Sequence, residues 1–335
     1  MTDARNKRLR DRLEAYWKHP SMDLFDELAV DVFRYQASRN PVYARYLELL
    51  QCDPGAVEAP ERIPFLPIRL FKTHALRTGD WVPETVFTSS GTTGKTTSRH
   101  EVRDLAFYLH NTERGFRHFF GPVEENAVLA LLPSYLERKG SSLVTMAGHF
   151  IRRSGYPESG FFLHQYDALI DRIGQLLDQG APTLLLGVTF ALLDLAERGP
   201  FPWSALKVME TGGMKGRRRE MVREEVHRRL CAAFDVDRVY SEYGMTELFS
   251  QAYSAGGGVF RPVPGMRVQA RQITDPFAAA PPGKTGVLNL IDLANLDTIS
   301  FVATDDLGRV FPDGSFEVLG RLDHSDLRGC NLLVL

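Results

Sequence analysis

The feature that most constrains the fold is an alternation of short apolar segments with longer amphipathic segments in the middle of the chain. The apolar segments have the length of buried strands, and we expect strands at 85–88, 127–132, 183–188, 206–210 and 238–241. We expect helices at 101–119, 166–179 and 189–198, with a further long helix after residue 213. Gly180 stands where a C′ glycine would end the helix at 166–179. This alternation predicts an α/β fold with a largely parallel sheet covered by helices on both faces.

The two ends of the chain follow other patterns. The first fifty residues read as helices, and residues 52–70 are rich in proline, which favours an extended connection. Helical spacing predicts one buried stripe made of Phe25, Leu28, Ala29, Val32 and Phe33. After about residue 255, short alternating segments separated by Gly and Pro predict an antiparallel β region. We therefore divide the 335 residues into a helical segment with its connection at 1–80, a core at 81–319 and a tail at 320–335.

Composition narrows the range of partners and compartments. The net charge of −2 gives no general attraction to nucleic acid or to anionic lipid. No apolar run approaches the ~20 residues of a membrane span, and the charged N-terminus lacks the apolar core of a signal peptide. The cysteines, Cys52, Cys231 and Cys330, are few, odd in number and without metal-ligand spacing. This usage favours free thiols in a reducing cytoplasm.

A segment rich in glycine and hydroxyl groups follows the first expected strand. It reads T-S-S-G-T-T-G-K-T-T at 88–97. Glycines let backbone N–H groups approach phosphate oxygens, and hydroxyls add further donors. It is not a Walker A loop, because Ser89 stands where that motif needs its first glycine. A polyphosphate loop and a plain polar turn both fit these residues. The phosphate contacts would come from Ser89, Ser90, Gly91, Thr92, Thr93, Gly94 and Lys95.

Two further segments carry reactive groups. S-E-Y-G-M-T-E at 241–247 combines an aromatic ring, a hydroxyl and a carboxylate, and G-R-L-D-H-S-D-L-R-G-C at 320–330 places an arginine before a cysteine. Together with the glycine-rich segment they indicate ATP, an activated carboxylic acid and a thiol that receives the acyl group.

The order of these motifs resembles that of the adenylate-forming enzyme superfamily, which includes acyl-CoA synthetases, peptide-synthetase adenylation domains and luciferase-like ligases. The matching elements are S-S-G-T-T-G at 89–94, T-G-G at 211–213, Y-G-M-T-E at 243–247, T-D-D-L-G at 304–308 and G-R-L-D at 320–323. The resemblance implies the large domain of that superfamily, with layered mixed and parallel sheets, helices and a C-terminal antiparallel β region.

The same resemblance implies ATP and Mg²⁺ as cofactors and gives site residues their roles. The glycine-rich loop would hold the phosphates. The remaining roles fall on Gly212 and Gly213 for the adenine side, Tyr243 with Gly244 for packing on adenine, Thr246 for the α-phosphate, Glu247 for Mg²⁺, and Asp306 with Arg321 for the ribose. Such donors and a metal would stabilise the negative charge that accumulates as an acid attacks the α-phosphate.

A narrower resemblance concerns the acyl acceptor. P-S-Y-L-E-R-K-G-S-S-L at 133–143, Y-G-M-T-E-L-F-S-Q-A-Y at 243–253 and L-R-G-C-N-L-L at 327–333 resemble the acyl-protein synthetases (fatty-acid–protein ligases) of bacterial bioluminescence. The resemblance implies a fatty acid substrate, transfer of the acyl group to Cys330 as a thioester, and an acyl reductase or acyl carrier as partner. A thiolate is a good acyl acceptor, although the apolar segment after Cys330 also fits a packed cysteine.

The chain departs from the superfamily in one major respect. The mobile C-terminal domain, which carries a lysine that promotes adenylation, has no counterpart after Asp323. Lys95, Arg99 or Lys215 would then supply the cation, or adenylation would be slow. Two alternatives stay open: an acyl-adenylate-forming ligase that serves an external thiol or amine, on a carrier protein or a small metabolite, and a nucleotide-binding subunit without catalysis.

Overall fold

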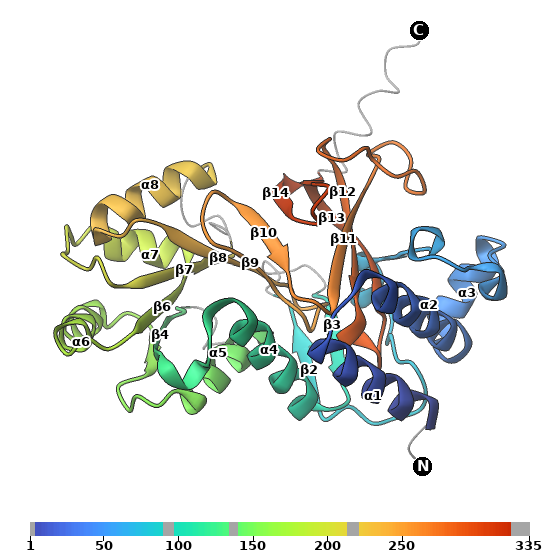
Figure 1. The fold of residues 1–335 in the computed structure, drawn as a ribbon, viewed down its shortest axis with the longest axis horizontal. Helices are drawn as coiled ribbons and strands as arrows, with labels where there is room; N and C mark the ends of the chain where they lie inside the picture. Colours follow the sequence, from blue (N-terminus) through green and yellow to red (C-terminus); the bar gives the residue numbers. More distant parts are fainter. Residues whose placement is uncertain (1–3, 90–96, 134–139, 213–220, 323–335) are drawn as a thin grey trace, which may run out of the picture.

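The computed structural model describes residues 4–89, 97–133, 140–212 and 221–322 (Figure 1). Its centre is a twelve-stranded sheet in the order β11-β12-β13-β14-β10-β9-β8-β7-β6-β4-β5, with β1 paired to β13 outside this path. The strands from β5 to β8 are parallel, and those from β8 to β11 are antiparallel. The predicted mixed architecture is therefore confirmed.

The parallel half is built from the apolar segments that alternate with helices. Its strands are β4 (Ala127–Leu131), β5 (Gly160–Phe162), β6 (Thr183–Val188), β7 (Lys207–Thr211) and β8 (Val239–Tyr243). The helices around them are α4 (Leu105–Phe120), α5 (Ser142–Arg153), α6 (Tyr166–Asp178), α7 (Thr189–Ala196) and α8 (Arg223–Phe234), with the 3₁₀ turn η4 (Val123–Glu125). Every residue of β4 and β6 is buried, as strands with two covered faces require. Gly180 has φ +70° directly after α6, which confirms it as the C′ glycine.

The antiparallel half follows from residue 252 onward. It comprises β9 (Ala252–Ser254), β10 (Val259–Pro262), β11 (Met266–Arg271), β12 (Gly286–Asp292), β13 (Phe301–Val310) and β14 (Phe316–Arg321), with the 3₁₀ turn η5 (Leu293–Asn295). β11 shows the expected alternation, with Met266, Val268 and Ala270 buried and the residues between them half-buried. The prediction of an antiparallel region after about residue 255 is confirmed.

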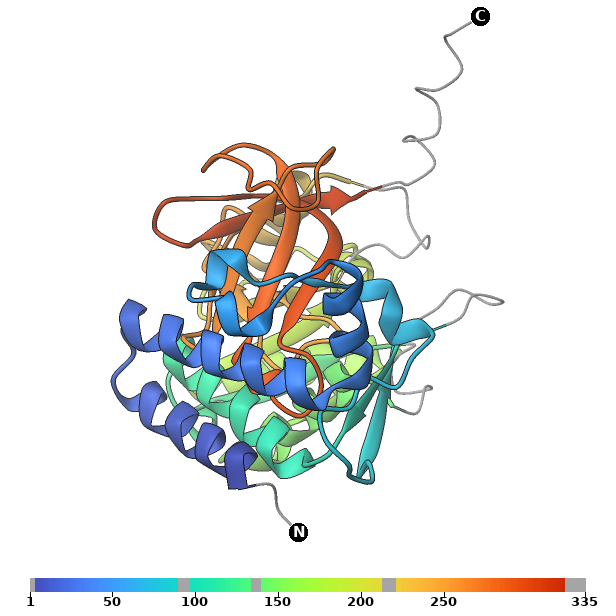
Figure 2. The same cartoon turned by 90° about the vertical axis from the view of Figure 1, so that its right-hand side faces the viewer.

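Three helices at the N-terminus cover the antiparallel half (Figures 1 and 2). They are α1 (Ala4–Lys18), α2 (Met22–Arg39) and α3 (Pro41–Leu49). Asn40 separates α2 from α3, and its side chain accepts from the backbone N–H of Tyr43 to cap α3. The predicted stripe of α2 is buried. Gln36 fixes this helix to the sheet, because its amide donates to the carbonyls of Asn295 and Leu296 and accepts from the backbone N–H of Ser300.

The structure corrects the expectation of an extended connection at 52–70. This segment contains the 3₁₀ turns η1 (Pro54–Ala56), η2 (Pro60–Arg62) and η3 (Ile68–Lys72) and the short strand β1 (Leu66–Pro67). Proline is well placed to start such turns, because its fixed φ suits a first helical position and its missing N–H is not needed there. Pro54 and Pro60 both occupy that position.

A second correction concerns the glycine-rich segment. The strand β2 (Thr85–Thr88) does not join the parallel sheet and is not followed directly by a helix. It pairs with β3 (Arg99–Val102) in a separate antiparallel hairpin, and α4 begins only at Leu105. β3 escaped prediction because one of its two buried positions is His100, a polar residue that hides the period-2 pattern. The glycine-rich segment is therefore the connection of a hairpin.

The core is continuous across both halves of the sheet. One cluster of buried apolar side chains extends from Leu9 in α1 to Phe316 in β14. A smaller cluster of Phe87, Val102, Tyr108, Phe249 and Ala294 lies under the hairpin. None of the helices within the described ranges is long and apolar enough to cross a membrane.

Candidate functional site

Three of the predicted site residues meet where β8, β13 and β14 come together. Tyr243 ends β8, and its hydroxyl donates to Oδ2 of Asp306 in β13 over 2.8 Å. The register of β13 and β14 places Arg321 opposite Asp306, and Nε of Arg321 lies 3.2 Å from Oδ1. Residues more than sixty positions apart thus form one polar group.

Aromatic packing fixes the ring of Tyr243. It lies edge-on to Phe316 with 5.4 Å between ring centroids, and 5.9 Å from Phe260. Burial raises the pKa of Tyr243 well above its ordinary value, and the adjacent charge of Asp306 raises it further. The hydroxyl therefore stays protonated and acts as the donor to Asp306.

Glu247 lies in the turn region that follows β8 and is 6% exposed. Burial raises the pKa of its carboxyl group, whereas a hydrogen bond from Ser98 and the positive charge of Arg321 lower it. The neighbouring charge of Asp306 adds to the upward shift. Glu247 therefore belongs to the same electrostatic group as Asp306 and Arg321. A cation placed beside it would favour its charged form.

The backbone around Glu247 is held by buried polar side chains. Nδ2 of Asn295 donates to the Glu247 carbonyl over 2.8 Å. The Asp292 carboxylate accepts from the backbone N–H groups of Phe249 and Ser250 over 2.8 and 2.9 Å. Because every backbone group named here has a partner, the turn is set by the fold before any ligand binds.

His100 connects the hairpin to this turn. Its Nδ1 lies 2.9 Å from the Thr246 carbonyl, and its Nε2 lies 2.8 Å from the Thr298 hydroxyl. A carbonyl only accepts, so Nδ1 carries the proton and Nε2 accepts from Thr298. Burial lowers the pKa of His100 to about 4, so the ring is neutral at physiological pH.

Aromatic contacts reinforce the same connection. The rings of Phe87 in β2 and Tyr108 in α4 are 4.8 Å apart, and Tyr108 lies 5.1 Å from Phe249. His100 packs on Phe249 at 4.8 Å. These contacts fix the hairpin against the turn that carries Thr246 and Glu247.

The hairpin is closed at the base of the glycine-rich segment. The backbone N–H of Ser89 donates to the Ser98 carbonyl over 3.1 Å, and the Ser89 hydroxyl accepts from the backbone N–H of Ser98 over 2.9 Å. Ser98, the hydrogen-bond partner of Glu247, therefore lies at this base. The other predicted phosphate residues, Ser90, Gly91, Thr92, Thr93, Gly94 and Lys95, lie outside the described residues, as do Gly213, Lys215 and Cys330.

Gly212 and Gly244 stand at positions that a side chain would disturb. Gly212 follows β7 with φ +74°, in the left-handed region that favours glycine. A Cβ atom on Gly244 would collide with the carboxyl group of Glu242. Burial raises the pKa of Glu242 to about 7, while a hydrogen bond from Thr211 lowers it.

Within the described ranges no group of three or more His, Cys, Asp or Glu side chains could hold a metal ion. Glu247 offers a single carboxylate. Mg²⁺ is commonly bound by one or two carboxylates together with substrate phosphates. The donor set therefore fits an ion that arrives with a polyphosphate, and it does not fit an ion held by protein ligands alone.

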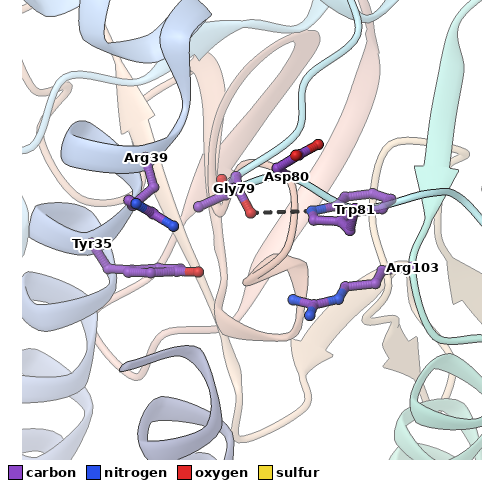
Figure 3. Close-up of a pocket in the computed structure, with 7 residues that line it drawn as sticks. Tyr35, Arg39, Gly79, Asp80, Trp81 and Arg103 are labelled. Atoms are coloured by element: carbon purple, nitrogen blue, oxygen red, sulfur yellow. Dashed lines mark hydrogen bonds between the residues drawn. The ribbon is translucent and has the colours of Figure 1, made fainter. Parts of the chain in front are cut away.

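Four residues of this site were missed in the sequence: Ser98, His100, Asp292 and Asn295. They are polar residues that the fold buries, and their partners are distant in the chain. Asp292 stands in the alternating segment 287–292, which predicted only β structure, and no sequence pattern marked Ser98, His100 or Asn295. A small hollow of about 230 Å³ lies elsewhere, between Tyr35 and Arg39 of α2 and the segment from Thr78 to Trp81, with Arg103 at its side (Figure 3).

Comparison with solved structures identifies the fold. A 2-hydroxyisobutyryl-CoA ligase in the postadenylation state with 2-HIB-AMP matches with a TM-score of 0.66 and 15% identity, over 91% of this chain and 69% of the ligase. The same ligase with 2-HIB-AMP and CoA in its thioesterification state gives 0.65 and 17%, over 92% and 71%. ATP-bound MatB from Rhodopseudomonas palustris gives 0.53 and 16%, over 74% of this chain and 49% of that one.

The chain thus has the fold of adenylate-forming enzymes and spans about half the length of MatB. No protein-family model and no curated protein sequence matches it.

Proposed function

We propose that the protein activates a carboxylic acid with ATP as an acyl-AMP and then transfers the acyl group to the thiol of Cys330. The observation that carries the proposal is the single group formed by Tyr243, Asp306, Arg321 and Glu247. These residues come from three sequence motifs. Their side chains suit the roles that the resemblance implies: an aromatic ring for adenine, a carboxylate and a guanidinium group for the ribose, and a carboxylate for Mg²⁺. A fatty acid is the substrate class that the narrower resemblance of the sequence favours.

In the first step a carboxylate oxygen of the acid attacks the α-phosphorus of ATP. The new P–O bond forms as the bond to pyrophosphate breaks, and pyrophosphate leaves with the electron pair. The ring of Tyr243 would face the adenine, Asp306 would accept hydrogen bonds from the ribose hydroxyls, and Glu247 would hold Mg²⁺. The ion neutralises charge on the phosphates when it is bound.

In the second step the thiolate of Cys330 attacks the acyl carbon. The C–S bond forms, the C–O bond to AMP breaks, and AMP leaves with the electron pair. The thiol proton has already been lost to solvent, because the thiolate is the nucleophile.

A second candidate is transfer to an external thiol, on a carrier protein or a small molecule. It is favoured by the similarity to a ligase solved with both 2-HIB-AMP and CoA. The two candidates share the first step and differ only in the acceptor.

The acceptor is tested with the Cys330→Ser variant. The protein is incubated with ATP, Mg²⁺ and a panel of acids of different chain length, and intact mass and pyrophosphate release are followed. We expect a hydroxylamine-labile adduct on the wild-type protein and none on the variant, with pyrophosphate release retained. A serine hydroxyl is far less ionised than a thiol of pKa ~8.5 and should not replace it at neutral pH.

Cys52→Ser and Cys231→Ser are the matched controls, since both thiols are partly buried and burial raises the pKa of each. An adduct that survives in Cys330→Ser would remove Cys330 as the acceptor. Pyrophosphate release without any adduct on the wild-type protein would favour the external acceptor. Absence of both ATP binding and pyrophosphate release would refute the activation step itself.

A further inference from the structure

A groove lies on the face of the antiparallel strands that is turned away from Asp306. Asp305 and Asp306 are neighbours in β13, so their side chains point to opposite faces of the sheet. Asp306 faces Tyr243, whereas Asp305 lines the groove. The groove has a volume of about 650 Å³, which lies within the ~300–1,000 Å³ typical of ligand pockets. The hollow in Figure 3 is smaller than that range.

The floor and one wall of the groove are rigid elements. Gln269, Arg271, Asn289 and Ala303 belong to β11, β12 and β13 and form its floor. The segment 61–69 forms a wall, and in Figure 2 this blue segment lies across the orange strands. The wall is attached to the floor because β1 pairs with β13.

The other wall is the connection between β11 and β12, and it presents apolar side chains. Phe277 is 67% exposed and Ile273 is 38% exposed. Their loop is nevertheless ordered by its own hydrogen bonds, from the backbone N–H of Phe277 to the Asp275 carboxylate over 2.9 Å and from that of Gln272 to the Ala278 carbonyl over 2.8 Å. Two large apolar side chains thus remain exposed beside a cavity, and ligand pockets are lined predominantly by apolar side chains with a few polar groups.

Three guanidinium groups line the same groove. The guanidinium group of Arg271 already has partners within the protein, since it donates to Asn289 and to the Thr304 carbonyl and lies near Asp305. For Arg62 and Arg69 no side-chain hydrogen bond or ion pair to another residue exists within the part of the chain that the structure describes. Among the described residues that line the groove, Glu61 and Asp305 are the carboxylates, so the guanidinium groups exceed the carboxylates there.

We infer that this groove binds an acyl-chain anion. The apolar chain would lie against Phe277, Ile273 and Ile68, and the carboxylate or phosphate head would pair with Arg62 and Arg69. Guanidinium groups bind both heads through paired N–H donors. A small inorganic anion would leave the apolar wall uncovered, and an uncharged chain would leave the arginines without a partner. The site is separate from that of the proposed activation and does not depend on it.

The test uses a local reporter, the Phe277→Trp variant of the full chain, in the absence of ATP and Mg²⁺. Its tryptophan emission is followed during titration with decanoate, decyl phosphate, decanol, inorganic phosphate and polyglutamate, each below its aggregation limit. We expect a saturable blue shift with decanoate or decyl phosphate, which separates the two heads, and at least tenfold weaker binding of decanol. Arg62→Gln with Arg69→Gln should weaken decanoate binding at least tenfold.

Matched controls separate this site from any other acyl site. Val82→Trp places a reporter at a position that is 85% exposed and outside the groove, and it should not respond. Glu247→Gln, added to Phe277→Trp, should leave the titration unchanged. Equal binding of decanoate and decanol, binding that the arginine substitutions leave intact, or a response to polyglutamate alone would overturn the inference.

Discussion

At the scale of single residues, burial and the neighbouring groups have conflicting effects on the pKa of Glu247. Burial raises the pKa of its carboxyl group, and the Ser98 hydroxyl and Arg321 act in the opposite direction. A divalent cation would resolve the conflict, because an adjacent positive charge favours the carboxylate. We therefore expect the charge of Glu247 to affect the rate of the proposed activation step, in which metal and nucleotide are bound.

We predict that Glu247→Gln lowers acid-dependent pyrophosphate release by on the order of 10²-fold, the usual size of a lost electrostatic contact to the reacting group. Glutamine keeps the shape and removes the charge, so the fold should be preserved. The measurement is a rate at several Mg²⁺ concentrations, with circular dichroism as the check on folding. Ser98→Ala, which removes only one hydrogen bond to the carboxylate, should reduce the rate less. A folded Glu247→Gln protein with the wild-type rate would contradict the assignment.

At the scale of elements, the sequence predicted best what depends on local apolar pattern. β4 and β6 follow from apolar runs of strand length, and α6 from periodicity and Gly180. The hairpin of β2 and β3 was not predicted, because its identity depends on pairing between Arg99–Val102 and Thr85–Thr88 across an intervening loop.

The residues of the candidate site also fall into a group that the sequence predicted and a group that it did not. Tyr243, Glu247, Asp306 and Arg321 stand in motifs and could be named from the sequence. The residues that hold the turn around Glu247 in place, His100 and Asn295, could not be named from the sequence. Their hydrogen-bond partners are distant in the chain, and no local sequence pattern indicates such pairing.

The hairpin gives a prediction at this scale. His100→Phe keeps an aromatic ring beside Phe71 and Phe249 but removes both hydrogen bonds of the imidazole. The Thr246 carbonyl would lose its partner, which should lower the free energy of unfolding by about 1–3 kcal/mol. Urea unfolding measures this loss. His110→Phe is the control, because His110 is largely exposed and should change stability little. Equal stabilities for the wild-type protein and His100→Phe would show that the bond to Thr246 does not hold the turn.

At the scale of the whole molecule, two buried groups give stability opposite dependences on pH. The pKa of His100 is about 4 when folded and 6.5 ordinarily, so its contribution is complete above pH 6.5 and is lost as pH falls through 4. The pKa of Glu242 is about 7 when folded and 4.5 ordinarily, so its contribution is complete below pH 4.5 and is lost as pH rises through 7. Between pH 4.5 and 6.5 the free energy of unfolding rises with pH because of His100 and falls with pH because of Glu242, and the two changes cancel.

A variant that lacks one of these two groups should therefore show the pH dependence of stability that the other group causes. Glu242→Gln retains a neutral side chain of similar shape, so we expect its stability relative to the wild-type protein to increase from pH 4.5 to pH 7. The increase should be about 3 kcal/mol, because one pKa unit corresponds to about 1.4 kcal/mol. The variant's own stability should rise with pH between 4 and 6.5, the window of His100. Urea unfolding at half-unit pH intervals measures both curves. His100→Phe should show the converse, a stability that falls between pH 4.5 and 7. A constant difference between Glu242→Gln and the wild-type protein would mean that Glu242 ionises in the folded protein as it does in water, and that the strand end beside Tyr243 is open to solvent.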